Sequence, residues 1–153
     1  MRRRSLLTAA VLVLLAAPAR AHDWNDQNVA WKPLDDGLAL AKKEKRPVCL
    51  VVYTETCPHC ANYAKVFHDP KVVEKSKQLV MVRLDQGKDR EHTGKYVPDG
   101  AYIPRTMFLA ADGTLAPDIH APREQYKYFY DENNPASVLA GMDAALAKLA
   151  PKK

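Results

Sequence analysis

The sequence predicts an α/β fold in which a central mixed sheet, built from a βαβ unit and a β-hairpin, is covered by flanking helices. Two short apolar runs rich in β-branched residues, at 48–53 and 79–85, are typical of strands buried on both faces. The segment between them has a helix-like pattern, as a parallel crossover requires. A third apolar run at 106–110 is followed by an Asp-Gly turn, and a helical pattern then ends the chain.

The first predicted helix covers residues 34–45 and follows a polar start. Leu34, Leu38 and Ala41 recur at helical spacing. Arg46-Pro47 ends this helix because proline cannot continue it. The first buried strand follows directly.

The segment CPHCANYAKVF at 57–67 predicts a helix whose first turn contains two cysteines. Pro58 suits an early helical position, where no amide hydrogen bond is lost. Asp69-Pro70 predicts the start of a short helix, and LVMVRLD at 79–85 predicts the second buried strand. Residues 86–100 have the polar, Gly-rich composition of a long loop.

The last part of the chain predicts a hairpin and a covering helix. The strand at 106–110 is expected to pair, through a turn at Asp112-Gly113, with a partner around 114–116. Asn134 as N-cap and Pro135 at the first position begin the last helix. The apolar positions of this helix are Val138, Leu139, Met142, Leu146 and Leu149.

An aromatic run before the last helix has two interpretations. Tyr126, Tyr128 and Tyr130 alternate with Lys127 and Phe129. This alternation predicts a half-buried strand that packs under the last helix. An exposed contact surface for protein substrates is the alternative.

Residues 1–21 have the pattern of an export signal. Arg2, Arg3 and Arg4 precede an apolar run, which is too short to span a bilayer, and an Ala-x-Ala cleavage pattern ends at Ala21. We therefore expect a periplasmic or secreted protein. The arginines followed by SLL loosely resemble a twin-arginine signal, but basic residues are ordinary at the start of any export signal, so the general secretory route is favoured. After cleavage it would be a single domain, residues 22–153, with no stable membrane anchor.

Removal of the signal changes the charge of the protein. Four of the 23 Lys and Arg residues lie in the signal, so 19 basic residues remain against 18 acidic ones, a net charge of +1. Nothing in this balanced composition indicates a nucleic-acid partner, because no basic stripe is interleaved with aromatic residues. The remaining length suits one ordinary domain that can bury its core without disulfide staples.

Two of the three cysteines form a Cys-Pro-His-Cys motif where the first strand of the βαβ unit meets its helix. That is the thioredoxin arrangement. Cys57, at the N-terminal edge of the helix, would be stabilised as a thiolate by unpaired amides and the helix dipole. Cys60, one turn later, is placed to attack a mixed disulfide at Cys57. Cys57 is thus the candidate nucleophile and Cys60 the resolving thiol.

The two residues between the cysteines should tune the redox equilibrium. Pro58 stiffens the turn. His59 can donate a hydrogen bond or carry a positive charge near the Cys57 sulfur, which stabilises the thiolate relative to the disulfide. A histidine here therefore favours a more oxidising disulfide.

The cysteine pair has two alternative roles, as part of a metal site or as a structural disulfide. A metal site needs four ligands, and the motif supplies two; His68, His92 and His120 are scattered, so we predict no metal and no cofactor. His22, as a new N-terminus, could bind copper, although a single residue is weak support. A structural 57–60 bridge closes a very short loop and gains little chain entropy.

The buried strand, the CPHC motif and the later AYIPRTMFLAADGTL together resemble the thioredoxin-fold oxidoreductases. The closer resemblance is to the small thioredoxin-domain proteins of the anterior gradient group. DGAYIPRTMFLAADG, YKYFY and SVLAGMDAALAKL carry this resemblance, which covers most of residues 31–149. The Pro-His dipeptide is similar to that of the periplasmic oxidase DsbA.

The resemblance implies that Pro104 is a cis-proline beside the active site and that the backbone of Ile103 pairs with an extended substrate. The sequence also departs from thioredoxin, because Val51 occupies the place of a buried acid and Thr56 that of a tryptophan. Proton transfer must therefore differ. We expect Glu55 to be an exposed loop carboxylate, the alternative being a group that helps proton transfer through water. We expect Cys49 to be a small buried hydrophobic residue rather than a third redox partner.

The sequence therefore predicts an exported thiol-disulfide oxidoreductase that exchanges disulfides with protein substrates and depends on an unidentified redox partner protein. His59 favours an oxidase or isomerase over a reductase. The alternative is a non-catalytic thiol- or copper-binding chaperone of the same fold.

Overall fold

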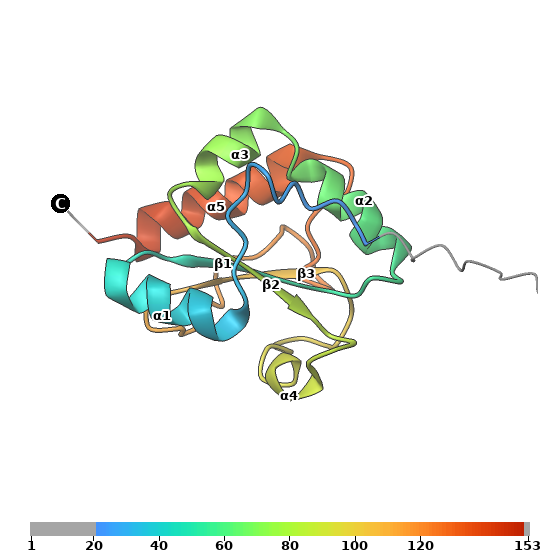
Figure 1. Cartoon of the computed structure of the whole chain (residues 1–153), viewed down its shortest axis with the longest axis horizontal. Coiled ribbons are helices and arrows are strands. Elements are labelled where there is room, and N and C mark those ends of the chain that lie inside the picture. The colour runs from blue at the N-terminus through green and yellow to red at the C-terminus, as the bar shows by residue number, and fades with distance from the viewer. Residues whose placement is uncertain (1–20, 152–153) are drawn as a thin grey trace, which may run out of the picture.

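The computed structural model describes residues 21–151, so the predicted export signal lies almost entirely outside the described residues. A central sheet separates two layers of helices (Figure 1). Side chains of alternating positions in the first strand enter two apolar clusters, one on each face of the sheet. The domain is therefore built in three layers, as the α/β prediction requires.

The sheet has three strands, β1 (Val48–Tyr53), β2 (Val80–Asp85) and β3 (Arg105–Leu109), in the order β2-β1-β3. β1 pairs in parallel with β2 and antiparallel with β3, so the sheet is mixed as predicted. Every residue of the central strand β1 is buried. This burial explains why the sequence of β1 is continuously apolar rather than alternating.

The expected hairpin after β3 is only a short one. Residues 114–116 do not form a strand; Leu115 makes a single antiparallel bridge with Leu109. Two backbone bonds support it, from the Ala110 amide to the Thr114 carbonyl (2.8 Å) and from the Ala116 amide to the Phe108 carbonyl (2.9 Å). The next residue is Pro117, which has no amide hydrogen to continue the ladder.

Four predicted helices are present, and one was not expected. The predicted ones are α1 (Leu34–Glu44), α2 (Pro58–Val66), α3 (Pro70–Ser76) and α5 (Pro135–Leu149). A short helix, α4 (Arg90–Thr93), lies in the segment predicted as a loop. It begins because the side chain of Asp89 accepts a hydrogen bond from the amide of His92 (3.0 Å).

The strand prediction for the aromatic run is wrong. The run consists of turns, and Tyr126 has a left-handed φ of 52°. Tyr128 and Tyr130 are buried, whereas Tyr126 is 52% exposed. The amide of Thr106 in β3 donates to the Tyr128 carbonyl at 2.8 Å, so the run is attached to the sheet without becoming a strand. Of the three tyrosines, only Tyr126 is exposed to contact another protein.

The polar start before α1 packs into the core. Trp24 is 1% exposed, and its ring centroid lies 5.0 Å from that of Tyr53 and 5.7 Å from that of Phe67. The side chain of Trp31 donates to the Trp24 carbonyl at 2.8 Å. This segment therefore covers the sheet as part of the domain. Within residues 21–151, no helix is both long and apolar enough to cross a membrane.

Candidate active site

The Cys57 sulfur lies at the N-terminal end of α2. Cys57 is the N-cap of this helix, and its Sγ accepts a hydrogen bond from the amide of Cys60 (3.3 Å). Pro58 follows at the first helical position, where its missing amide hydrogen costs no bond. Cys57 as a whole is half-buried, unlike the fully buried Cys60. The sulfur therefore lies at the positive end of the helix dipole and accepts a backbone amide.

The second cysteine is in a different environment. Cys60 is fully buried in the core cluster beside α2. Burial raises the pKa of the Cys60 thiol well above its usual range, and the hydrogen bond with Cys57 and the negative charge of Glu132 add to the rise. Cys60 is therefore a protonated, shielded thiol at neutral pH.

The loop before β3 reaches the cysteine pair from a distant part of the sequence. The Ile103–Pro104 peptide bond is cis. Pro104 is buried, Ile103 is half-buried, and the Ile103 carbonyl oxygen lies 3.9 Å from the Cys57 sulfur. The residues that the resemblance placed beside the active site are thus next to the candidate nucleophile.

A buried arginine holds this loop in place. Arg105 is 0% exposed, and its guanidinium donates to the carbonyl oxygens of Tyr96 (2.7 Å) and Tyr102 (2.6 Å) and to Oε1 of Gln86 (2.7 Å). These contacts connect the end of β2, the segment after α4 and the residue before Ile103. Sequence reasoning missed Arg105. Its only signal was a charged residue at the edge of an apolar strand.

His59 does not direct its hydrogen bond at the Cys57 sulfur. Its Nδ1 lies 2.9 Å from Oε2 and 3.0 Å from Oε1 of Glu132. The ring also packs edge-on against Phe129, with centroids 5.9 Å apart. His59 is therefore adjacent to the cysteines in the chain, while its ring is fixed by the segment that precedes α5.

Glu132 is the carboxylate that sequence reasoning missed. Its side chain is only 13% exposed, and Oε1 also accepts a bond from the Asn62 side chain (3.4 Å). The position where thioredoxin has a buried acid is Val51, which is fully buried in the core. Glu132 enters from the opposite end of the sequence, 73 residues beyond His59, so no local pattern indicated it.

Glu55 is not the exposed carboxylate that we expected. It is half-buried and accepts hydrogen bonds from the Tyr53 hydroxyl (3.2 Å) and from the backbone amide of His22 (3.1 Å). The ring of His22 is 3.1 Å from the Thr54 carbonyl. Through its hydrogen bond with the His22 amide, Glu55 connects the start of the described chain to the loop before Cys57.

The remaining candidate ligands do not gather into a site. Among residues 21–151, no three His, Cys, Asp or Glu side chains come together to hold a metal ion. His68 contacts Asp23, His92 contacts Asp89, and His120 contacts the Ala121 carbonyl. Cys49 is fully buried as expected, and burial raises the pKa of its thiol far above the usual range.

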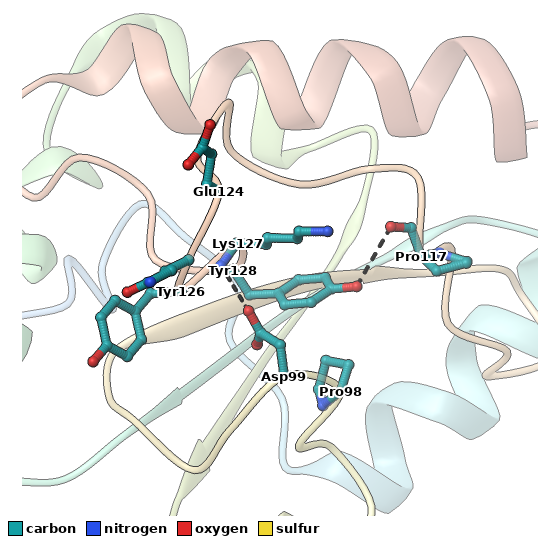
Figure 2. Close-up of a pocket in the computed structure, with 8 residues that line it drawn as sticks. Pro98, Asp99, Pro117, Glu124, Tyr126, Lys127 and Tyr128 are labelled. Carbon is teal, nitrogen blue, oxygen red and sulfur yellow. Dashed lines mark hydrogen bonds between the residues drawn. The ribbon is translucent and has the colours of Figure 1, made fainter.

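Three hollows lie near the aromatic run. One of about 820 Å³ adjoins His59 and is lined by Phe129 and the start of α5. A smaller one, of about 250 Å³, joins Ile103 to Tyr102, Tyr126 and Phe129 and is mainly apolar. Figure 2 shows the third, where Asp99 contacts the backbone of Lys127 and the Tyr128 hydroxyl points to Pro117. This third hollow contains no predicted site residue.

The comparison with protein families identifies the class. A model of the thioredoxin-like family matches residues 30–111, which is more than half of the chain. The protein belongs to the thioredoxin-like family. The matched residues include the CPHC motif and the Ile103–Pro104 bond.

Comparisons with individual proteins and solved structures support the assignment to the thioredoxin-like family. The chain is similar to anterior gradient protein 2 homolog from Homo sapiens, with 29% identity over 127 residues that cover 82% of this chain and 71% of that protein. A thioredoxin from Thermus thermophilus has a TM-score of 0.60 at 22% identity, covering 79% of this chain and 89% of that one. The structure of DsbH oxidoreductase has a TM-score of 0.59 at 16% identity, covering 92% and 96%. The predicted thioredoxin fold and the anterior gradient resemblance are confirmed.

Proposed function

We propose that this protein is an exported thiol-disulfide oxidoreductase that exchanges disulfides with protein substrates through Cys57 and Cys60. The observation that carries the proposal is the placement of the Cys57 sulfur. It is half-buried at the start of α2, it accepts the Cys60 amide at 3.3 Å, and it faces the Ile103 carbonyl at 3.9 Å. Such a sulfur is open to a substrate and lies at the positive end of a helix, whereas Cys60 is shielded.

In the oxidising direction, a substrate thiolate attacks Sγ of Cys57 in the Cys57–Cys60 disulfide. The bond between the two protein sulfurs breaks, and Cys60 leaves with the electron pair and takes up a proton. A second substrate thiolate, having lost its proton, then attacks the substrate sulfur of the mixed disulfide. Cys57 leaves as a thiolate, so that the substrate loses two electrons and the protein gains them.

Isomerisation begins in the reduced protein. The Cys57 thiolate attacks a substrate disulfide and forms a mixed disulfide, and the released substrate thiolate attacks another substrate disulfide. Cys60 rescues a stalled intermediate after losing its proton, by attacking Cys57. Because burial raises the pKa of Cys60, this rescue step is slow without a base, which leaves time for rearrangement.

Ile103, Pro104 and the small apolar hollow beside them support a docking site for an extended substrate segment. The exposed Tyr126 borders this hollow together with Phe129. The signal pattern in residues 1–21 supports export, with residues 22–153 as a single thioredoxin-like domain in the periplasm or outside the cell. A redox partner protein of that compartment would restore the active-site disulfide.

The decisive experiment compares three cysteine variants on a dithiol peptide substrate. Cys57→Ser should abolish peptide oxidation because no sulfur remains at the accessible position. Reduced Cys60→Ser, mixed with the same peptide in its disulfide form, should accumulate a mixed disulfide, visible by mass under non-reducing conditions. Cys57 breaks the peptide disulfide by exchange, and no second protein thiol is left to resolve the product. Cys49→Ala is the matched control and should oxidise the peptide at the normal rate, since Cys49 is buried away from the substrate.

Normal turnover by Cys57→Ser would refute the proposed chemistry. Stoichiometric copper binding that both active-site variants lose, with no turnover by the unaltered protein, would instead support a copper-binding chaperone.

A further inference from the structure

The contact between His59 and Glu132 is made by the tertiary fold. His59 is exposed over 63% of its side chain, but the carboxylate it meets is 13% exposed. Both carboxylate oxygens are within 3.0 Å of Nδ1, and Asn62, one turn further along α2, donates to the same group at 3.4 Å. Two residues of the helix that carries the cysteines thus bind one carboxylate from the segment before α5.

This contact changes what His59 supplies to the cysteine pair. When the ring is protonated, its Nδ1 and the Glu132 carboxylate form an ion pair at 2.9 Å. The resulting ion pair has no net charge, so its field at the cysteine sulfurs is weaker than that of an imidazolium standing alone. The same carboxylate raises the pKa of Cys60, although less than burial does. The weaker positive field at the two sulfurs and the raised pKa of Cys60 each disfavour a thiolate. Both effects therefore favour the disulfide over the reduced pair.

The other ionisable groups around His59 are few. Arg123 and Asp131 line the same hollow as His59. The guanidinium of Arg123 lies 5.1 Å above the Phe129 ring and donates to the Phe129 carbonyl at 3.0 Å. Asp131 is exposed and accepts the amide of Asn133 at 2.9 Å. On α2, Lys65 donates to Oδ1 of Asn62 at 3.2 Å, so its charge lies next to the Asn62–Glu132 contact, and the cysteines are the neighbours of His59 in the chain. Among the described residues, Glu132 is the one whose charged atoms contact the ring.

We propose that Glu132 offsets the charge of His59 and so makes the Cys57–Cys60 disulfide a weaker oxidant than its CPHC motif would otherwise make it. This inference rests on the proposed function, because it concerns the potential of the same cysteine pair. Glu132 is a positioning residue that acts through His59. The couple concerned is the reduction of the protein disulfide by two glutathione molecules, which yields the dithiol and one glutathione disulfide.

The test measures the equilibrium constant of this reaction for the full mature protein in glutathione buffers. Glu132→Gln keeps the shape and the acceptor oxygen but removes the charge. At about pH 6, where an unpaired histidine is mostly protonated, it should raise the constant about tenfold, equivalent to about 30 mV toward a stronger oxidant. At about pH 8 the gain should fall below about threefold, because the unpaired ring is then neutral.

A second variant should move the equilibrium in the opposite direction. His59→Ala leaves the carboxylate without its cation, which disfavours the thiolate and should lower the constant severalfold at both pH values. Asp131→Asn is the matched control, because it removes one negative charge from the adjacent residue without touching His59. The equilibrium constant of Asp131→Asn should stay within about twofold of that of the unaltered protein.

The outcomes separate the two proposals. If the unaltered protein shows no glutathione-dependent transition, the proposed function itself fails. If it shows one, but Glu132→Gln behaves like Asp131→Asn at about pH 6, the proposed role of Glu132 is overturned and the function stands. A shift of Glu132→Gln and His59→Ala in the same direction would also overturn it, since it would indicate loosened packing rather than a lost charge.

Discussion

Two tyrosines buried in the same apolar cluster differ in what their hydroxyl groups contact. The hydroxyl of Tyr63, on α2, is 2.8 Å from Oγ1 of Thr106 on β3. This bond joins the helix that carries the cysteines to the strand that follows Pro104. The buried hydroxyl of Tyr130 has no partner among the residues that the structure describes. The tyrosine hydroxyl is therefore expected to contribute differently to the free energy of unfolding at the two positions.

Replacing each tyrosine by phenylalanine tests this difference. Tyr63→Phe should lower the free energy of unfolding by about 1 to 2 kcal/mol, because the Thr106 hydroxyl loses its partner in the core. Tyr130→Phe should leave it unchanged or raise it by up to about 1 kcal/mol, because an unpaired buried hydroxyl is removed. Urea unfolding of the reduced proteins measures both. Equal losses in the two variants would contradict this assignment.

The packing of α5 on the sheet depends on one close approach. A Cβ atom at Gly141 would lie 2.5 Å from a ring carbon of Phe108 and 2.7 Å from the hydroxyl of Tyr130. Both rings are buried and cannot swing into solvent. Gly141 therefore lets α5 lie against β3 and the aromatic run, the same run that leads into Glu132. The helix that ends the chain thus helps to place the carboxylate beside His59.

Gly141→Ala should destabilise the protein, although helix propensity alone would predict a gain of about 1 kcal/mol. Overpacking in a core costs about 1 to 3 kcal/mol, so we expect a net loss of about 1 kcal/mol or more. Ala147→Gly, at an exposed position of the same helix, is the control and should lose about 1 kcal/mol by propensity only. Urea unfolding measures both losses, and a Gly141→Ala protein more stable than the unaltered one would show that the close approach is unimportant.

The domain as a whole keeps a group of weak acids neutral in its interior. Burial is the main cause that raises the pKa of Tyr53 to about 12 and that of Tyr63 well above its ordinary value. The pKa of Tyr130 is raised in the same way, again chiefly by burial. The buried thiols of Cys49 and Cys60 share this cause. All of these groups ionise more readily in the unfolded chain.

Stability should therefore fall at alkaline pH. Below about pH 8 these groups are protonated in both states, so they do not make stability depend on pH. Above the unfolded pKa values, about 8.5 for cysteine and about 10 for tyrosine, the unfolded chain binds fewer protons than the folded one. Each group then lowers the free energy of unfolding by about 1.4 kcal/mol per pH unit until its folded pKa is reached.

Urea unfolding of the reduced protein between about pH 8 and pH 11 measures this slope, and tyrosinate absorbance follows the ionisation itself. The absorbance of the folded protein should rise later than that of the urea-unfolded chain. If the free energy of unfolding is constant over this range, folding does not raise the pKa values of the core tyrosines and cysteines.

The sequence was sufficient to find the three strands of the sheet, the helices α1, α2, α3 and α5, and the cysteine pair. The bounds of β1, the cap at Cys57, the start of α5 at Pro135 and the burial of Cys49 all follow from patterns within a few residues. Local patterns succeed here because burial on both faces, capping and proline geometry act between near neighbours in the chain. The position of Pro104 beside the cysteines came from the family resemblance instead.

Other features depend on which elements meet in space. The aromatic run alternates like a strand, yet it forms turns whose carbonyl at Tyr128 bonds to β3. Trp24 lies in a polar segment and is still buried, because the rings of Tyr53 and Phe67 meet it. In the sequence, Glu132 is one of several acidic residues in an irregular segment, and no local pattern distinguishes it from the others. It became part of the site because the packing of α5 brings its carboxylate to His59, and contacts over such distances along the chain leave no periodic signal in the sequence.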